Sequence, residues 1–308
     1  MSIDHRVYPS IERLTELSRL GRQLSWHPPF QRMTPLTGKH KSQQRGRGLD
    51  FIELRHYYPG DDVRCIDWKV TQRTRQPYLR VYSQENDKNI TFLIDLRNPM
   101  FFASDGSMKS VIAAELVAIV SGATNQEGDR FGGVIITNTR LMQIPFKRGE
   151  KALFGLLNTL VDCAQQLPNW ESDVTPPTLH QALEYLVNLG VKDSQCFIMS
   201  DFHDYDQKHT STMISNLARR NSLIGFRITD PIEAQFPQQD LVVGNSEYQI
   251  EIKEGNQQLR ADFADYIQRQ KEQIAEHFMS LRLALLEITT HQEAWTQLHT
   301  FANEAHHD

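Results

Sequence analysis

Apolar residues in most of this chain fall into short, nearly continuous runs separated by longer amphipathic stretches. The runs from residue 89 onward are 89–95, 131–137, 195–201, 222–230 and 281–288, and 140–146 is predicted to add an antiparallel or edge strand. Continuous apolar runs are typical of strands covered on both faces. Helical periodicity fills 107–126, 150–166, 178–190, 209–221, 259–280 and 291–304. This alternation predicts a doubly wound α/β fold with a mostly parallel sheet.

The first 88 residues follow a different pattern. Residues 9–24 place apolar side chains three or four apart behind Ser10, which predicts an amphipathic helix with Ser10 as its N-cap. Residues 25–38 contain three prolines and predict a connector, and the basic, glycine-rich stretch 38–48 predicts a surface loop without the P-loop pattern. We therefore expect an N-terminal lead-in over 1–88 and an α/β domain over 89–308.

Composition and charge narrow the class of protein. The chain has 308 residues, of which 39% are hydrophobic and 23% charged, as in ordinary globular proteins. It shows no apolar run of the roughly 18–20 residues that a membrane helix needs, no signal peptide and no CxxC pairing of its three cysteines. These features predict a cytoplasmic protein with reduced thiols and no direct membrane insertion.

The net charge of −5 is distributed unevenly. Residues 1–88 hold 16 Lys and Arg against 10 Asp and Glu, so this part is basic and the remainder is acidic. A nucleic-acid-binding protein usually has a denser basic face, so nucleic acid is not an expected partner.

Three of the predicted strands end in an aspartate, namely Asp95, Asp201 and Asp230. Ligands of open α/β sheets bind at the carboxyl ends of strands, so Asp95 and Asp201 are candidates for one crevice. The alternative is that each carboxylate caps the loop or helix that follows its strand.

A charged stretch at residues 56–75 carries further candidate residues. Pro59 and Gly60 predict a turn, and residues 62–72 predict a short helix that Asp61 or Asp62 caps. Within that helix Arg64 and Asp67 are spaced to pair, while Tyr57 and Trp68 offer large areas to bury. Residues 77–85 then alternate as in a half-exposed strand.

Three interpretations of this stretch are open. Asp61, Asp67 and Lys69 resemble the metal-binding and water-polarising groups of a nuclease, but the two acids are only six residues apart. Nucleic acid would be bound through the basic residues with Trp68 as a stacking platform; these residues are Arg64, Lys69, Arg73, Arg75 and Arg80. In the third interpretation Asp61, Asp62 and Trp68 belong to a structural scaffold, and Arg73 and Arg75 face a protein partner.

Residues 37–85, followed by 89–102, resemble the bacterial proteins called domain-of-unknown-function 58. The shared residues of the pattern F-x-x-x-R-x-Y-x-x-G-D-D-x-R-x-I-D-W are Phe51, Arg55, Tyr57, Gly60, Asp61, Asp62, Arg64, Ile66, Asp67 and Trp68. The resemblance implies a von Willebrand factor A-like domain after this signature. It also implies a MoxR-type AAA+ ATPase as partner, in the assembly or maturation of protein complexes, and no established enzymatic reaction.

The resemblance also implies where a divalent cation would bind. Von Willebrand A domains use a D-x-S-x-S loop after the first strand, the metal-ion-dependent adhesion site, together with a later Thr and Asp. The loop here reads Asp95-Leu96-Arg97-Asn98-Pro99, so the aspartate is kept and both serines are lost. Thr178 (or Thr175) and Asp201 match the later ligands.

This degenerate loop predicts that no metal is bound, because Mg²⁺ prefers about six hard oxygen ligands. We expect the Arg97 guanidinium to take the cation's place and pair with Asp95 or Asp201, the alternative being that it points into solvent. The sequence thus favours a non-enzymatic adaptor without a cofactor. The alternative is a metal-dependent hydrolase, a nuclease or phosphatase, that uses the aspartates and Mg²⁺.

Overall fold

The computed structural model describes residues 4–24, 49–58, 61–84, 89–167, 174–234, 241–244, 249–252 and 257–307. The chain forms two compact units. The sheet unit comprises Met1–Gly38 and Lys88–Asp308, and the hairpin unit comprises Lys39–Asp87. The predicted connector at 25–38, the basic loop at 38–48 and the Pro59-Gly60 turn lie outside the described residues.

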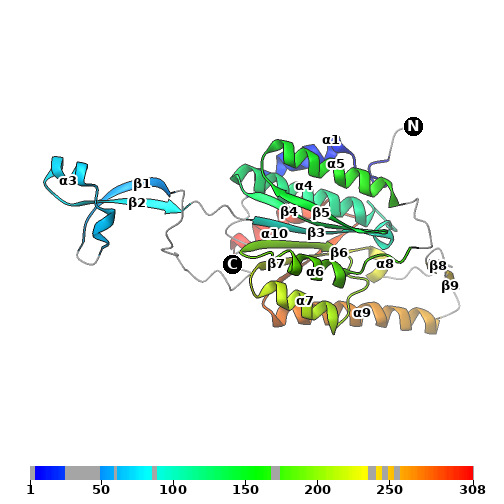
Figure 1. Ribbon diagram of the computed structural model, residues 1–308. Coiled ribbons are helices and arrows are strands. Elements are labelled where there is room, and N and C mark those ends of the chain that lie inside the picture. Colours follow the sequence, from blue (N-terminus) through cyan, green and yellow to red (C-terminus); the bar gives the residue numbers. More distant parts are fainter. Residues whose placement is uncertain are drawn as a thin grey trace. The chain divides into compact units, whose positions relative to one another are not determined.

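The sheet unit is built on a six-stranded sheet (Figure 1). In sheet order its strands are β10 (Ala284–Thr289), β7 (Ser222–Thr229), β6 (Ser194–Ser200), β3 (Asn89–Leu96), β4 (Arg130–Thr137) and β5 (Leu141–Lys147). Only β5 runs antiparallel, paired with β4 at the edge. The described chain also has an antiparallel pair, β8 (Leu241–Gly244) and β9 (Gln249–Ile252), and a short helix α8 (Pro231–Ala234). The predicted doubly wound α/β fold is confirmed.

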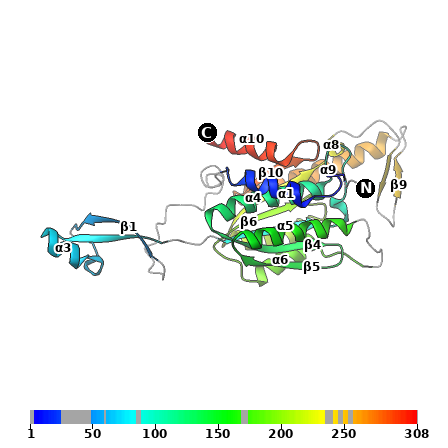
Figure 2. The same ribbon diagram turned by 90° about the horizontal axis from the view of Figure 1, so that it is seen from above.

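Helices cover both faces of this sheet (Figure 2). One hydrophobic cluster joins the sheet to α1 (Ile11–Gly21), α4 (Lys109–Glu127), α5 (Glu150–Gln165) and α10 (Ala294–His307). The cluster on the other face joins it to α6 (Leu179–Asn188), α7 (His209–Ala218) and α9 (Gln257–Ser280). Each predicted strand and helix of this region is present, with ends that differ by a few residues.

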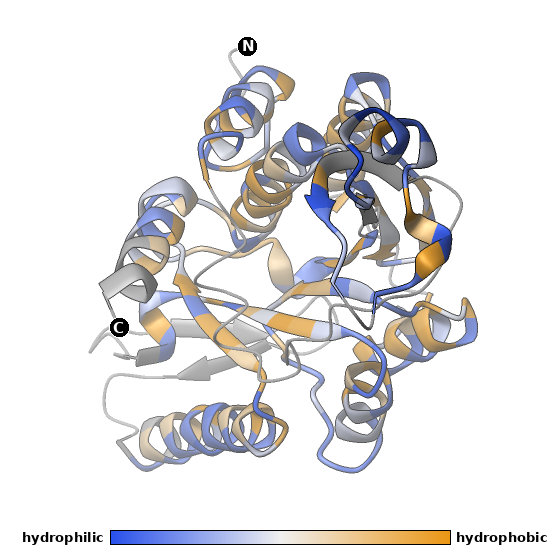
Figure 3. Cartoon of the chain, turned by 90° about the vertical axis from the view of Figure 1, so that its left-hand side faces the viewer, coloured by the Kyte–Doolittle hydropathy of each residue, from blue (hydrophilic) through white to orange (hydrophobic). Residues whose placement is uncertain are grey.

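Helix α4 is the centre of the first layer. Every residue from Lys109 to Thr124 is buried, because α1, α5, α10 and the sheet surround the helix. A helix covered on all sides needs no polar face, and its apolar character extends around its circumference. Figure 3 shows the same preference, with hydrophobic residues concentrated along the inner strands and hydrophilic ones on the outer helix faces.

The N-terminal helix α1 packs tightly against α4. Ser10 caps α1 by accepting a hydrogen bond from the Arg13 amide, as predicted. A Cβ placed on Gly21 would lie 2.1 Å from the Ile119 carbonyl oxygen, and one on Gly122 would lie 1.9 Å from that of Ser18. The two backbones therefore approach to a distance that only glycine permits. Helix α1 therefore belongs to the sheet unit. The expected lead-in over residues 1–88 is not one unit, because its first 38 residues group with the α/β domain.

The hairpin unit consists of β1 (Leu49–His56) and β2 (Tyr78–Gln84), paired antiparallel. The signature stretch, residues 51–68, begins in β1 and continues into the segment between the two strands. The helix predicted over 62–72 is interrupted: a 3₁₀ helix η1 (Val63–Cys65) precedes the α-helix α3 (Trp68–Thr74). The break has a physical reason, because Ile66 forms a β-bridge with Leu79 and the Asp67 amide donates to the Tyr78 carbonyl. These strand-like contacts require extended backbone where the periodicity predicted a helix.

We predict that Gly122→Ala destabilises the protein, because its new methyl group would overlap the α1 backbone. The expected loss is about 1–3 kcal/mol in the free energy of unfolding, measured by urea denaturation. Gly155→Ala is the matched control, since that helical position has no atom within 4 Å of an added Cβ and should gain about 0.5–1 kcal/mol from helix propensity. Equal stability of Gly122→Ala and the wild type would contradict the close packing of α1 on α4.

Candidate functional site

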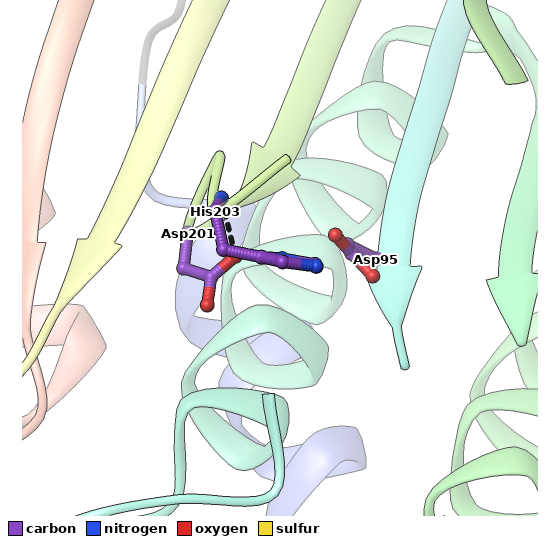
Figure 4. Close-up of side chains that lie close together, drawn as sticks. All are labelled: Asp95, Asp201 and His203. Carbon is purple, nitrogen blue, oxygen red and sulfur yellow. Dashed lines mark hydrogen bonds and ion pairs between the residues drawn. The ribbon is translucent and has the colours of Figure 1, made fainter. Parts of the chain in front are cut away.

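Two strand-end aspartates meet at the carboxyl edge of the parallel sheet. Asp95 lies near the end of β3 and Asp201 directly follows β6, and these two strands are neighbours. His203 folds back toward both of them (Figure 4). One ligand atom from each of the three side chains lies within 4.8 Å of the other two. The predicted pairing of the two strand ends at one site is therefore present in the structure.

A buried arginine holds Asp95. The Arg97 side chain is only 3% exposed and grips the carboxylate with two nitrogens, Nε to Oδ1 at 2.8 Å and Nη2 to Oδ2 at 2.6 Å. Asp95 itself is fully buried, and its Oδ2 also accepts a hydrogen bond from the Ser200 hydroxyl at 2.8 Å. Bidentate, charge-assisted contacts of this kind are the strongest hydrogen bonds that side chains form.

The same guanidinium also binds Asp204. Its Nη1 donates to Asp204 Oδ2 at 2.6 Å and its Nη2 to Oδ1 at 3.0 Å, while the second Nη1 hydrogen reaches the Pro177 carbonyl at 3.1 Å. All five N–H donors of Arg97 thus have acceptors. Burial disfavours the charged guanidinium, but the two carboxylates outweigh it and raise the pKa of Arg97. We call Asp95, Arg97 and Asp204 the arginine clasp.

Asp201 has a different cation, Lys109, which is the first residue of α4. The Lys109 ammonium lies 3.5 Å from Asp201 Oδ2 and 2.6 Å from Glu233 Oε1, and all three residues are largely or wholly buried. Burial opposes the charge of Asp201, yet Lys109 and the hydrogen bonds from His203 lower its pKa well below the usual range. Burial likewise opposes the charge of Lys109, and the two acids raise its pKa.

A sharp turn after β6 brings His203 onto Asp201. Phe202 is buried and adopts a left-handed backbone with φ of 57°, which is rare for a bulky residue and marks a constrained turn. It directs the His203 amide and Nδ1 to the same oxygen of Asp201, at 3.1 and 2.9 Å. Burial favours neutral imidazole, but the hydrogen bond and charge of Asp201 outweigh it and raise the pKa of His203.

A line of charged groups continues from Glu233 toward the edge of the sheet. Arg227 lies between Glu233 and Glu287, at 3.4 and 3.2 Å, and Lys271 of α9 pairs with Glu287 at 2.7 Å. The side chain of Asp230, the third strand-end aspartate, forms no hydrogen bond or ion pair with Arg97, Lys109 or the two other strand-end aspartates. It accepts hydrogen bonds from Ser104 and Thr290, which tie the loop after β3 to the end of β10. Its Oδ1 also accepts the Ile232 amide at 3.0 Å and so caps the segment that follows β7, as the capping alternative predicts.

The cluster is poorly suited to a metal ion. Asp95, Asp201 and His203 are the group among the described residues that could supply three ligands, but a permanent cation already contacts Asp95 and a second one faces Asp201. Thr178 is used elsewhere, since its hydroxyl caps α6 by accepting from the Gln181 amide. Mg²⁺ would have to displace both cations and still gain about three more oxygen ligands.

The aspartates of the signature stretch hold local structure. Asp61 forms a bidentate pair with Arg55 at 2.7 and 2.8 Å and accepts the Tyr58 amide. Asp62 caps η1 through the Arg64 amide, and Asp67 caps α3 through the amides of Lys69 and Val70. These contacts agree with the scaffold interpretation of Asp61 and Asp62, and Asp67 has the same kind of role.

Trp68 does not follow the scaffold interpretation. Its side chain is 69% exposed, so the expectation that it buries a large area is wrong, whereas Tyr57 is half-buried. The cause is its position at the start of α3, whose inner face is formed by Val70 and Thr71. Arg64, Arg73 and Arg75 are also exposed. Gly60 lies outside the described residues.

The sequence interpretation missed four members of the charged site at the carboxyl edge of the sheet. One is His203, which stands two residues after Asp201 and contacts its carboxylate. Asp204 stands three residues after the strand-end Asp201 and binds Arg97 in place of the expected Asp201. Lys109 and Glu233 were also missed, because each lies far along the chain from its partner and has no local motif. The sequence does draw attention to Asp204, because residues 201–206 contain three acids within six positions directly after a predicted strand.

Comparison with known proteins assigns the family. Residues 53–273 match the family model described as "Protein of unknown function DUF58", so the chain belongs to the DUF58 family. Uncharacterized protein Rv1480 of Mycobacterium tuberculosis and uncharacterized protein Mb1516 of Mycobacterium bovis are each 24% identical over 261 residues, covering 84% of this chain and 80% of theirs.

Three solved structures match this chain at 9% sequence identity. They are the conserved hypothetical protein BatB from Bacteroides thetaiotaomicron (TM-score 0.45, covering 72% of this chain and 100% of that one) and an aerotolerance-related membrane protein from Bacteroides fragilis (0.40, 70% and 99%). The third is an uncharacterized membrane spanning protein from Vibrio fischeri (0.23, 70% and 98%). Similarity at this level carries no argument about function.

The cytoplasmic assignment made from the sequence is corrected by these comparisons, since two of the three similar structures are named as membrane proteins. That assignment rested on the absence of a long apolar run, which tests whether a segment crosses a bilayer and not where a protein works. Within the described residues, no helix combines the length and the apolar character needed to span a membrane.

We predict that Arg97→Ala is strongly destabilising, because it leaves two carboxylates without their cation in the protein interior. The expected loss is about 3–5 kcal/mol in the free energy of unfolding, measured by chemical denaturation. The control is Arg269→Ala, which removes an exposed pair with Asp265 at 3.7 Å and should change stability by less than about 0.5 kcal/mol. Similar small losses in both variants would contradict a structural role of the arginine clasp.

The contact between His203 and Asp201 predicts a dependence of stability on pH. Because the folded-state pKa of His203 is raised, its contribution is fully present below the unfolded value of about 6.5 and is lost as the pH rises through the folded value. The lowered pKa of Asp201 works at the acidic end: its contribution is present above about pH 3.9 and is lost as the pH falls.

The test compares wild type with His203→Gln by denaturation between pH 5 and 9. We expect the wild type to be the more stable protein near pH 5.5 and the difference to shrink on the alkaline side. A nuclear magnetic resonance titration of the His203 ring should give a midpoint above 6.5. A midpoint below that value, or a difference that grows with pH, would contradict the ion pair.

Proposed function

We propose that this DUF58 protein is a non-enzymatic adaptor that works with a MoxR-type AAA+ ATPase in the assembly or maturation of other protein complexes. The main observation against an enzymatic reaction at this site is the arginine clasp. A guanidinium with all five donors in use occupies the position beside the strand-end carboxylate where a catalytic metal would need to sit.

Two features support the adaptor role. The buried charges at the carboxyl edge of the sheet are matched in pairs, which leaves few groups free to act as general acid, base or metal ligand. The family's signature stretch forms a separate unit that exposes arginines and a tryptophan, residue types that concentrate binding energy at protein interfaces. The choice of a MoxR-type partner comes from the family resemblance of that stretch.

A second candidate is a metal-dependent hydrolase, favoured by the proximity of Asp95, Asp201 and His203. For this function the Arg97 guanidinium would have to leave its two carboxylates when Mg²⁺ or Mn²⁺ binds. The buried, bidentate geometry and the need to displace Lys109 as well make that exchange costly.

The two functions are separated by calorimetric titration of the purified protein with Mg²⁺ and Mn²⁺ and by a binding assay with a MoxR-type ATPase from the same genome, with and without ATP. We expect no metal binding at micromolar concentrations and a complex with the ATPase. Metal binding that Asp95→Asn abolishes, together with nuclease or phosphatase activity lost in the same variant, would replace the adaptor by the hydrolase. Asp67→Ala serves as the comparison, because Asp67 caps α3 in the other unit.

A further inference from the structure

Two histidines from different helices lie in ring contact on one side of the sheet unit. His180 is the second residue of α6 and His209 is the first residue of α7, and these two helices pack against each other (Figure 1). The centres of the two rings are 5.7 Å apart, and the ring planes make an angle of 65°. Neither histidine is part of the arginine clasp or of the group Asp95, Asp201 and His203.

The Asp206 carboxylate fixes which ring nitrogen of His209 is available. Asp206 Oδ2 contacts His209 Nδ1 and also accepts the His209 amide at 2.7 Å. The amide hydrogen bonds from His209 and Lys208 lower the pKa of Asp206, so its carboxylate is ionised and can only accept. Nδ1 therefore carries a proton, and the lone pair of the neutral ring is on Nε2. Metal-binding histidines commonly donate their second nitrogen to a carboxylate in this way, which orients the ring.

His180 has a ring nitrogen that lacks a hydrogen-bond partner. Its Nδ1 is shielded from solvent, and no group among the described residues forms a hydrogen bond with it. Buried polar atoms are almost always paired, so an unpaired one calls for an explanation. A metal ion is the partner that a neutral imidazole nitrogen takes in place of a hydrogen-bond donor.

The separation of the two rings suits a single ion. With Zn–N bonds of about 2.1 Å and tetrahedral angles, two imidazoles on one ion have ring centres about 5 Å apart. The observed 5.7 Å is slightly longer, and rotation of the His209 side chain, which is 62% exposed, can close the difference. The backbone need not move, because Leu179 and Thr210, which adjoin the two histidines, are fully buried and hold both helix starts in place.

We propose that His180 and His209 bind one transition-metal ion of the Zn²⁺ type, which cross-links the starts of α6 and α7, with Asp206 orienting His209 and water filling the remaining positions. Imidazole suits Zn²⁺, Cu²⁺ and Ni²⁺, whereas Mg²⁺ prefers oxygen ligands and Mn²⁺ is at the weak end of the series. The site is therefore independent of the strand-end aspartates and of the proposed function. Its effect is structural, because the ion ties α7 to the helix whose Leu179 amide donates to Asp204.

The experiment is a calorimetric titration of the full-length, untagged protein with ZnCl₂ after treatment with a chelator, near pH 7.5, where ordinary imidazole is neutral. We expect one ion per chain at micromolar concentrations and a higher melting temperature, since the ion binds the folded pair. His180→Ala and His209→Ala should each weaken binding by at least about tenfold, and Asp206→Asn by about tenfold, as is usual for the carboxylate behind a metal-binding histidine. Asp206→Asn keeps an oxygen for the amides at the start of α7.

Matched controls come from the other histidines of the chain. His306 and His307 are adjacent in the sequence and offer a second imidazole pair, so the double variant His306→Ala with His307→Ala should bind Zn²⁺ as the wild type does. Circular dichroism checks that each variant is folded. If His180→Ala does not fold, His209→Ala decides, because its side chain is mostly exposed. An excess of Mg²⁺ should not compete with Zn²⁺.

Three results would overturn the site. The first is a wild type that binds no Zn²⁺ at micromolar concentrations. The second is binding that persists in His209→Ala but is lost in Asp95→Asn or in the presence of Mg²⁺, which would place the ion at the strand-end aspartates. The third is binding that is lost in the double variant of His306 and His307, which would place it at the end of the chain. None of these results bears on the adaptor role, so the two proposals stand or fall separately.

Discussion

The carboxyl edge of the sheet depends on one buried ion pair, the contact of Arg97 with Asp95. Two carboxylates within a protein interior repel each other and are costly to desolvate, so they need a cation held in a fixed geometry. The planar guanidinium supplies that cation and five directed donors at once. The loop after β3, the turn after β6 and the start of α6 are all fixed by it, through Asp204 and the Pro177 carbonyl.

A second ion pair repeats this arrangement with different residues. Lys109 places a buried ammonium between Asp201 and Glu233, so the helix α4 and the short helix α8 join the same edge of the sheet. Ion pairs of this kind add little net stability over well-packed apolar residues, but breaking one is expensive. Their effect is to specify which loops lie together, and the result is an edge whose charges already have partners within the chain.

Much of the fold could be predicted because it is encoded locally. The continuous apolar runs predicted the strands, and Ser10 predicted the start of α1. The positions of Asp95 and Asp201 at strand ends predicted where the two carboxylates meet. The pairing of Arg97 with a strand-end carboxylate also followed from the lost serines of the loop. What could not be predicted depends on residues distant in sequence: Glu233 meets Lys109 only after the sheet has formed, and Ile66 bridges to Leu79 only once the hairpin has closed.

The order of segments has a mechanical consequence. The hairpin unit is an insertion, because the chain leaves the sheet unit after α1 and returns to it at β3. Tension applied to the hairpin unit would reach the sheet unit at two points. One is β3, the central strand that carries Asp95, and the other is α1, whose Gly21 packs closely against α4. Both anchors contribute side chains to the same hydrophobic cluster, so a pulling force on the hairpin unit would be shared between them.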